Sequence, residues 1–215
     1  MTFIPSQKQL EMVLQRLSGF ENPSASLEQY QTPAGIAAAW IWSMHMQGEV
    51  EGKVFADLAA GPGILGLGLL LMGAKKVHFV DIDEKTIITA KENLKFIEDL
   101  AKHNNAGLGE AVFHNVDVQE FDLKVDCVVQ NPPFGTKQKH IDKLFLETAF
   151  KIAPLVYSMH KITTEKFVVA ISKDYEFRIE SLQEFKFSLP KTMKHHKKRI
   201  EYTQVGLWKL KKVEK

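Results

Sequence analysis

Cysteine is almost absent from this sequence, since only Cys127 occurs among 215 residues. The chain therefore cannot form an internal disulfide or a paired-cysteine zinc site, which fits a reducing compartment. Long apolar runs are also missing, because no stretch approaches the roughly 20 residues that cross a bilayer. Residues 1–17 lack the basic and then apolar pattern of a secretory signal. These absences predict a cytoplasmic protein that is not bound to a membrane.

Repeats, low-complexity tracts and linkers longer than about a dozen residues are missing as well. The composition, 45% apolar and 25% charged, is typical of a globular chain, and we predict one domain over residues 1–215. Within it, residues 1–50 are predicted to form an N-terminal lid of two helices, 6–17 and 33–46, around a polar loop. Residues 51–215 are predicted to carry the sheet and the remaining helices.

Arginine is scarce, with three residues against 25 lysines, and the basic residues are unevenly placed. Residues 186–215 hold ten Lys or Arg against two Glu, whereas the first 185 residues have an acidic excess. Such a patch suits a polyanion, although a solvated lysine-rich end would have the same charge. The dominance of lysine favours attraction to a phosphate backbone over bidentate recognition of bases.

From Lys53 onward, short β-branched runs alternate with helical segments, as in βαβ units with a parallel sheet covered on both faces. The predicted strands are 54–57, 77–81, 111–115, 125–130 and 155–159, and the predicted helices are 63–72, 84–103 and 141–152. A helix near 164–172 follows, although 167–171 is also a plausible strand, and then an antiparallel pair, 177–189 and 201–210, joined by a basic turn. The predicted fold is a Rossmann-like α/β class with a seven-stranded, mostly parallel sheet.

A glycine pattern follows the first predicted strand. Gly61, Gly63 and Gly66 match G-x-G-x-x-G before a helix, and Asp81 ends the next strand twenty residues on. Such glycines let the backbone approach a ligand at a helix N-terminus, and the carboxylate can accept both hydroxyls of a ribose. A tight turn with helix-capping aspartates is the alternative, but it leaves unexplained why three successive strands end near Asp. We expect a nucleoside-bearing cofactor.

Two further aspartates distinguish among such cofactors. Asp57 comes directly off the first strand, where NAD enzymes usually have an apolar residue. A carboxylate there would repel a pyrophosphate but suit the sulfonium and α-ammonium groups of S-adenosylmethionine. Asp117 follows the third strand and can accept a hydrogen bond from an adenine amino group. We therefore predict S-adenosylmethionine. Ala59 occupies the first glycine position of the usual D-x-G-x-G-x-G pattern, where a methyl group fits if φ is negative.

The tetrapeptide Asn131-Pro132-Pro133-Phe134 follows the fourth predicted strand, at the end where α/β sheets bind ligands. An amine on an aromatic base is a poor nucleophile, because its lone pair is delocalised into the ring. The Asn131 side-chain oxygen and the Pro132 carbonyl can accept its two hydrogens and draw the lone pair out of conjugation, while the prolines fix both oxygens. Phe134 offers a stacking face. A plain Asn-Pro turn is the alternative, and it leaves the position beside the cofactor crevice unexplained.

Several segments are more specific together than any is alone. They are Asp81-Ile82-Asp83-Glu84, Asn131 through Lys137, Tyr157-Ser158-Met159-His160-Lys161, Leu27 through Pro33, and the tail Leu189-Pro190 with Lys194 to Arg199. With the glycine loop they resemble the methyltransferase-like protein five family of N6-adenine RNA methyltransferases, over nearly the whole chain. Asn-Pro-Pro-Phe alone would also admit glutamine or guanine N-methyltransferases. The chain departs from the family pattern at Ala59 and at Gln31, where proline is common.

The resemblance implies a class I, S-adenosylmethionine-dependent methyltransferase that forms N6-methyladenosine in structured RNA, in this family the small-subunit ribosomal RNA. It implies that the cofactor contacts Gln29, Thr32, Ala59, Gly61, Pro62, Asp81, Asp117 and Val118. To these we add Asp57, from the argument above, and Ile82, which is next to Asp81. The target adenine would be held by Asn131, Pro132, Pro133 and Phe134. Family members pair with a small zinc-binding activator protein along a sheet edge. The zinc would belong to that partner, and no metal site is predicted in this chain.

The basic turn is the predicted contact with nucleic acid. Its residues, which would neutralise phosphates in a salt-sensitive and sequence-independent manner, are Lys191, Lys194, His195, Lys197, Lys198 and Arg199. Adenine N6 lies on the Watson–Crick edge, so the target must be unpaired or flipped. Two alternatives stay open: a protein glutamine N-methyltransferase, and a non-catalytic RNA-binding assembly subunit. The basic turn argues against the first, and the set of cofactor carboxylates with Asn131 argues against the second.

Overall fold

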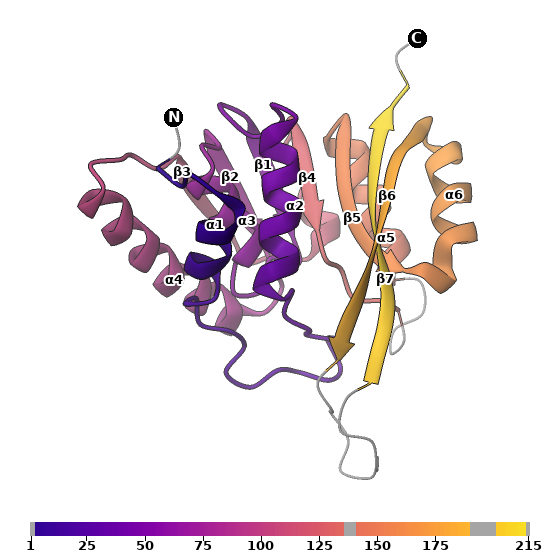
Figure 1. The fold of residues 1–215 in the computed structure, drawn as a ribbon. Helices are drawn as coiled ribbons and strands as arrows, with labels where there is room; N and C mark the ends of the chain where they lie inside the picture. Colours follow the sequence, from indigo (N-terminus) through magenta and orange to yellow (C-terminus); the bar gives the residue numbers. More distant parts are fainter. Residues whose placement is uncertain (1–2, 136–140, 190–200, 214–215) are drawn as a thin grey trace.

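The seven strands of the described chain form a single sheet in the order β3-β2-β1-β4-β5-β7-β6 (Figure 1). The structure is a computed structural model that describes residues 3–135, 141–189 and 201–213. The strands are β1 (Val54–Leu58), β2 (Lys76–Val80), β3 (Glu110–His114), β4 (Cys127–Gln130), β5 (Leu155–Lys161), β6 (Phe177–Leu189) and β7 (Glu201–Lys212). Strands β1 to β5 run parallel. Strand β7 is antiparallel to both of its neighbours, β5 and β6.

Helices cover both faces of the sheet (Figure 1). One face carries α1 (Gln7–Leu14), α2 (Ala34–Met46), α3 (Ile64–Leu71) and α4 (Glu84–His103), and the other carries α5 (Ile141–Ile152) and α6 (Glu165–Asp174). Two 3-10 turns, η1 (Val118–Glu120) and η2 (Ile162–Thr164), follow β3 and β5. In the part of the chain that the structure describes, no helix is both long and apolar enough to span a bilayer.

Helix α3 is apolar on every side, because it lies between the sheet and the helices α1 and α2. Two of its glycines make this close packing possible. A Cβ on Gly66 would lie 2.3 Å from the Phe79 ring of β2, and a Cβ on Gly68 would lie 2.4 Å from Ile41 of α2. Gly66 is the third glycine of the sequence pattern, so its role is to bring helix and strand together.

These features confirm the predicted fold class, the mostly parallel sheet and the antiparallel C-terminal pair. Helices α4 and α5 and strand β6 have the predicted bounds. The fourth strand begins later than predicted, at Cys127, because the Val125 and Asp126 amides bond to the Ile152 and Val54 carbonyls. The alternative strand at 167–171 is wrong, since this stretch lies within α6.

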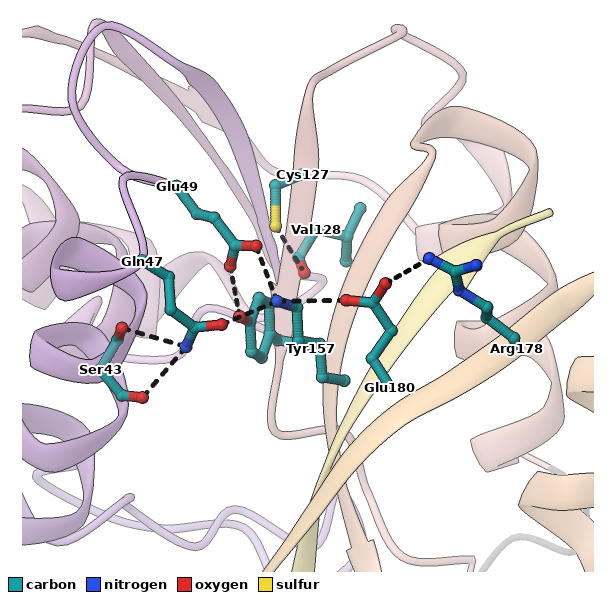
Figure 2. Close-up of polar contacts among 9 residues, drawn as sticks. Ser43, Gln47, Glu49, Cys127, Val128, Tyr157, Arg178 and Glu180 are labelled. Carbon is teal, nitrogen blue, oxygen red and sulfur yellow. Dashed lines mark hydrogen bonds and ion pairs between the residues drawn. The ribbon is translucent and has the colours of Figure 1, made fainter. Parts of the chain in front are cut away.

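A buried lysine connects the N-terminal helices to the C-terminal strands. We call its surroundings the Lys209 cluster. The Lys209 ammonium of β7 lies 2.8 Å from Gln47 Oε1, 2.7 Å from Glu49 Oε1 and 3.2 Å from Glu180 Oε2. The Tyr157 hydroxyl of β5 donates to the other Glu49 oxygen (Figure 2). Burial opposes the charge, but hydrogen bonds to the two carboxylates raise the pKa of Lys209 above its ordinary value.

The hairpin of β6 and β7 extends beyond the carboxyl edge of the parallel strands. Lys161, the last residue of β5, pairs with Val205, whereas Leu189 and Glu201 pair further along the hairpin. Residues 190–200 connect these two strand ends. The predicted nucleic-acid contacts therefore fall between them, outside the described residues: Lys191, Lys194, His195, Lys197, Lys198 and Arg199.

Candidate active site

A crevice with two adjoining cavities runs along the carboxyl edge of the sheet. Their shared walls are Phe20, Tyr30, Ala59 and Asn131. We call residues 20–33 the strap. Phe20 and residues 26–32 of the strap contribute to the cavity walls, and Figure 1 shows the segment between α1 and α2 passing beneath the sheet. One cavity is lined by the predicted residues Thr32, Asp57, Ala59, Gly61 and Pro62, and the other by Gln29, Asp81, Ile82, Asp117, Val118 and Pro133.

The glycine loop has three successive left-handed positions at its odd-numbered residues. Ala59 has φ 56°, Gly61 has φ 53° and Gly63 has φ 88°. The condition under which a methyl group fits without strain, a negative φ, is therefore not met at Ala59. This residue adopts a conformation that costs about 1–2 kcal/mol for a side chain with a Cβ. A Cβ on Gly61 would lie 2.8 Å from the Phe20 ring, so glycine lets the strap close over the loop.

Asp57 is fully buried at the floor of the smaller cavity. One of its carboxylate oxygens accepts a hydrogen bond of 2.8 Å from the Gly66 amide. Burial raises the pKa of Asp57 to about 7, because the Gly66 bond only partly offsets the loss of solvation, and the charge of Asp81 adds to the rise. A cation entering this cavity would stabilise the ionised carboxylate.

Asp81 and the strap are connected through the start of α4. The Asp81 carboxylate accepts hydrogen bonds from the amides of Gly61, at 2.8 Å, and Asp83, at 2.9 Å. Burial raises the pKa of Asp81. The Gln29 side chain donates to Asp83 Oδ2 at 2.8 Å. Ile82 is 58% exposed and forms an apolar wall of the larger cavity. Such a wall beside a carboxylate suits a nucleoside.

Asp117 both caps a turn and lines the crevice. Its Oδ1 accepts from the Gln119 amide at 2.9 Å, at the start of η1. The neighbouring Val118 is buried and lines the same cavity. The capping role that the sequence left as an alternative is therefore real, and it coexists with a position on the cavity wall.

Asn131 is the polar centre of the crevice. Its Nδ2 donates to Thr32 Oγ1 of the strap at 3.0 Å, which fixes the direction of the amide. Its Oδ1 is buried and has no hydrogen-bond partner among the described residues. A buried acceptor without a donor is costly and rare, so this oxygen is poised for a donor from a ligand. Pro132 is buried, and Pro133 lines the larger cavity.

Phe134 is placed differently from its predicted role. Its ring is 8% exposed, does not line either cavity, and has the Lys161 ammonium 5.6 Å from its centroid. The predicted stacking face is therefore covered in this structure. The Phe134 amide donates to Glu28 Oε2 of the strap at 3.1 Å. Glu28 is the functional candidate that sequence reasoning missed, since its only signal was membership of a segment that resembles the family.

Beneath Asn131, a buried chain of polar groups joins the ends of β4 and β5. Gln130 Nε2 donates to Ser158 Oγ at 2.8 Å, and Ser158 Oγ lies 2.6 Å from His160 Nε2. Burial lowers the pKa of His160 to about 3, so the imidazole is neutral at physiological pH. These groups hold the two strand ends together. No group of three or more His, Cys, Asp or Glu among residues 3–135, 141–189 and 201–213 could hold a metal ion.

Known proteins resemble this chain in sequence and in fold. The family model Methyltransferase small domain matches residues 38–155. The rRNA N(6)-adenosine-methyltransferase METTL5 of Danio rerio is 33% identical over 210 residues, with 92% of this chain and 95% of that protein covered. A Pyrococcus horikoshii protein classed provisionally as an RNA methyltransferase is 36% identical with a TM-score of 0.85, covering 97% of this chain and 98% of that chain.

A more distant structure shares the fold alone. Magnesium protoporphyrin IX methyltransferase of Synechocystis PCC 6803, solved with S-adenosylmethionine, is 16% identical with a TM-score of 0.65, covering 94% of this chain and 90% of that chain. Fold, crevice and family model together define a class I methyltransferase. The chain belongs to the methyltransferase-like protein five family, of which the Danio rerio enzyme is a member. The predicted enzyme class and family are thereby confirmed.

Proposed function

We propose that this protein transfers the methyl group of S-adenosylmethionine to N6 of an unpaired adenosine in small-subunit ribosomal RNA. The observation that carries the proposal is the buried Asn131 Oδ1 that lacks a donor, held in place by the bond from its own amide nitrogen to Thr32. An adenine N6 amine would supply the missing donor. Its second hydrogen would be accepted by the Pro132 carbonyl, so the nitrogen lone pair turns out of conjugation with the ring.

The cofactor side of the proposal is supported by the charges and shape of the crevice. S-adenosylmethionine, when bound, supplies a methyl group activated by its positive sulfonium. Asp57 offers a buried carboxylate to positive charge, and Asp81 offers one to ribose hydroxyls. Ile82 and Val118 flank the place for adenine, with Asp117 as acceptor for its amino group. The two adjoining cavities fit a long ligand of this kind because they share one wall.

The RNA substrate is supported by the relatives and by the charge of the chain. METTL5 of Danio rerio is named for rRNA N6-adenosine methylation. Leu189 and Glu201, which border the lysine-rich segment 190–200, belong to the hairpin that extends past the same sheet edge as Asn131. Lysines in that segment would contact phosphates near an adenosine that enters the crevice. Flipping or unpairing of this base is required for N6 to reach Asn131.

A small zinc-binding activator protein is the proposed partner, and β3 is its proposed docking edge. In the sheet order β3 is terminal, and its residues Ala111, Val112 and Phe113 carry no charge. An apolar edge strand without Lys or Pro is a template for pairing with another chain. A strand from the activator would cover it by adding to the sheet. The Glu110 amide and the His114 carbonyl bond to β2, so the alternate residues Ala111 and Phe113 turn their N–H groups to the open edge. This proposal predicts that Ala111→Pro weakens co-purification of the two proteins.

The test is methyl transfer from labelled S-adenosylmethionine to purified small-subunit and large-subunit rRNA, separately, with and without the activator. Nucleoside digestion identifies the product. We expect N6-methyladenosine in small-subunit rRNA. Asn131→Ala should reduce the rate by at least about 100-fold, the effect of losing one preorganised hydrogen-bond partner, while cofactor affinity stays within a few-fold. Asn22→Ala, an exposed control at the start of the strap, should be neutral.

The outcomes separate the alternatives. Label in large-subunit rRNA only would correct the substrate but keep the reaction. No label in either RNA, with cofactor binding shown by calorimetry, would refute RNA as the acceptor and favour a protein glutamine. Survival of turnover in Asn131→Ala would refute the role of this amide, whichever acceptor is used.

A further inference from the structure

The strap is hydrogen-bonded to both ends of residues 131–134, which we call the transfer motif. Thr32 Oγ1 accepts from the Asn131 side chain at 3.0 Å, and Glu28 Oε2 accepts from the Phe134 amide at 3.1 Å. Gln29, the neighbour of Glu28, donates in another direction, to Asp83 at the start of α4, at 2.8 Å. Three bonds from one short segment therefore span the crevice from the cofactor side to the acceptor side.

Glu28 is an unusual residue in this segment for two reasons. It is a carboxylate that is only 5% exposed, and it has φ 50°, a left-handed conformation that is unfavourable for a side chain with a Cβ. Burial of a carboxylate and a left-handed backbone persist only where surrounding contacts hold them. The bond from the Phe134 amide, at 3.1 Å, is such a contact.

The place of this contact in the motif gives it a function. The Pro132 and Pro133 nitrogens carry no hydrogen, so within the motif only Asn131 and Phe134 have a backbone N–H. Phe134 is thus the point at which a backbone hydrogen bond can anchor the chain beyond the two prolines. A shift at this point would move the Pro132 carbonyl, because the intervening backbone is stiff.

We infer that Glu28 is a positioning residue for methyl transfer: by binding the Phe134 amide it holds the Pro132 carbonyl and Asn131 in register with the acceptor amine. The inference rests on the proposed function of residues 131–134. Glu28 lines the larger cavity, and the role inferred for it requires neither proton transfer nor contact with the substrate. A residue of this kind acts on kcat, since it orders groups that matter in the transition state.

The kinetic test compares Glu28→Ala and Glu28→Gln with Glu21→Ala, which removes an exposed glutamate from the same strap. Methyl transfer to unmodified rRNA and calorimetric affinity for S-adenosylmethionine are measured for each. We expect Glu28→Ala to lower kcat by 10- to 100-fold, with cofactor Kd and KM for RNA changed by less than about three-fold. Glu28→Gln keeps an acceptor oxygen and should recover most of the rate. Glu21→Ala should match the wild type.

A second measurement does not depend on any substrate. Hydrogen exchange of a peptide that begins at Asn131 and ends at Gly135 reports only the amides of Phe134 and Gly135, because the first residue carries a free amine and prolines have no amide hydrogen. Loss of the Glu28 acceptor should speed exchange in this peptide by at least about ten-fold. Glu28→Gln and Glu21→Ala should leave exchange near the wild-type rate.

Each outcome decides the matter. A kcat within three-fold of wild type in Glu28→Ala, or unchanged exchange in residues 131–135, would overturn the inference. So would a parallel loss of rate and cofactor affinity, because that would mean collapse of the whole strap. If the wild type labels an acceptor other than RNA, the proposed substrate fails, and the comparison of the Glu28 variants is made on the labelled acceptor. If it labels none, the exchange result alone decides.

Discussion

The pKa of Asp57 predicts that the protein binds its cofactor more tightly as the pH rises through 7. Burial raises this pKa to about 7 in the unliganded protein, so the carboxyl group is mostly protonated at pH 6 and mostly ionised at pH 8. A ligand with a positive sulfonium and ammonium binds the ionised form. Protein molecules in which Asp57 is protonated must lose this proton before they bind the ligand. For a pKa of 7, this requirement weakens the affinity by about 11-fold at pH 6 and about 1.1-fold at pH 8. The expected gain from pH 6 to pH 8 is about ten-fold, or about 1.4 kcal/mol.

The assay is calorimetric titration of S-adenosylmethionine at pH 6, 7 and 8, with Asp57→Asn as the reference. The variant keeps an acceptor for the Gly66 amide but has no charge to titrate. The α-amino group of the ligand also titrates, near pH 8, and burial raises the pKa of Asp81 as well. The titration of the ligand is common to the two proteins and cancels in the ratio of their dissociation constants. The ratio therefore reports Asp57 together with its coupling to Asp81.

The ratio should favour the wild type about ten-fold more at pH 8 than at pH 6. Repeating the titration at pH 6 in two buffers of different ionisation enthalpy should show release of close to one proton by the wild type and fewer by the variant. A ratio that stays constant across this range, or one that moves toward the variant as the pH rises, would refute the role of Asp57.

Three further predictions concern other parts of the molecule. Ala59→Gly should relieve the left-handed strain and raise the free energy of unfolding by about 1 kcal/mol, seen as a Tm increase of a few degrees; a lower Tm would contradict the strain. Lys209→Met should cost about 3 kcal/mol in a denaturation experiment, because it leaves Glu49 and Glu180 without their shared cation, whereas Lys212→Met on the same strand should cost less than about 0.5 kcal/mol; equal losses would argue against the Lys209 cluster. Charge removal in the basic turn should lower the slope of log affinity for RNA against log salt by about 2 without changing cofactor affinity, and an unaltered slope would place RNA elsewhere; the residues to change to glutamine are Lys194, Lys197 and Lys198.

The fold was predictable where local signals agree with the long-range packing. Helix α4 begins after Asp83, which caps it through the Lys85 amide, and its apolar residues recur on one face. Asp57 and Asp81 were predictable as crevice residues because strand ends and glycines mark the edge of a parallel sheet. The prediction worked because each of these signals lies within one or two neighbouring elements.

The remaining features depend on contacts between distant segments, which leave no periodic pattern. Glu28 and Phe134 are 106 positions apart in the sequence, and neither residue type predicts the hydrogen bond between them. The left-handed φ of Ala59 occurs in a turn that is closed by the hydrogen bond from the Gly61 amide to Asp81. Because this bond holds the turn, position 59 adopts the left-handed conformation without being glycine. Lys209 counts toward the basic excess of residues 186–215, yet its charge is paired inside the protein. The net charge of that region therefore overstates what faces RNA.

The interior place of β7 has a consequence for how the protein is made. Every other strand precedes it in the chain, yet it lies between β5 and β6, so neither can complete its pairing before residues 201–212 have left the ribosome. The side chains of Gln47 and Glu49 are synthesised some 160 residues earlier than Lys209, and they lack its ammonium group until then. A nascent chain would hold two open strand edges and an unpaired acidic site until synthesis passes this point, a state prone to association with other chains. Fusion of a slow-translating segment before residue 201 should therefore lower the yield of native protein more than the same segment placed after residue 213.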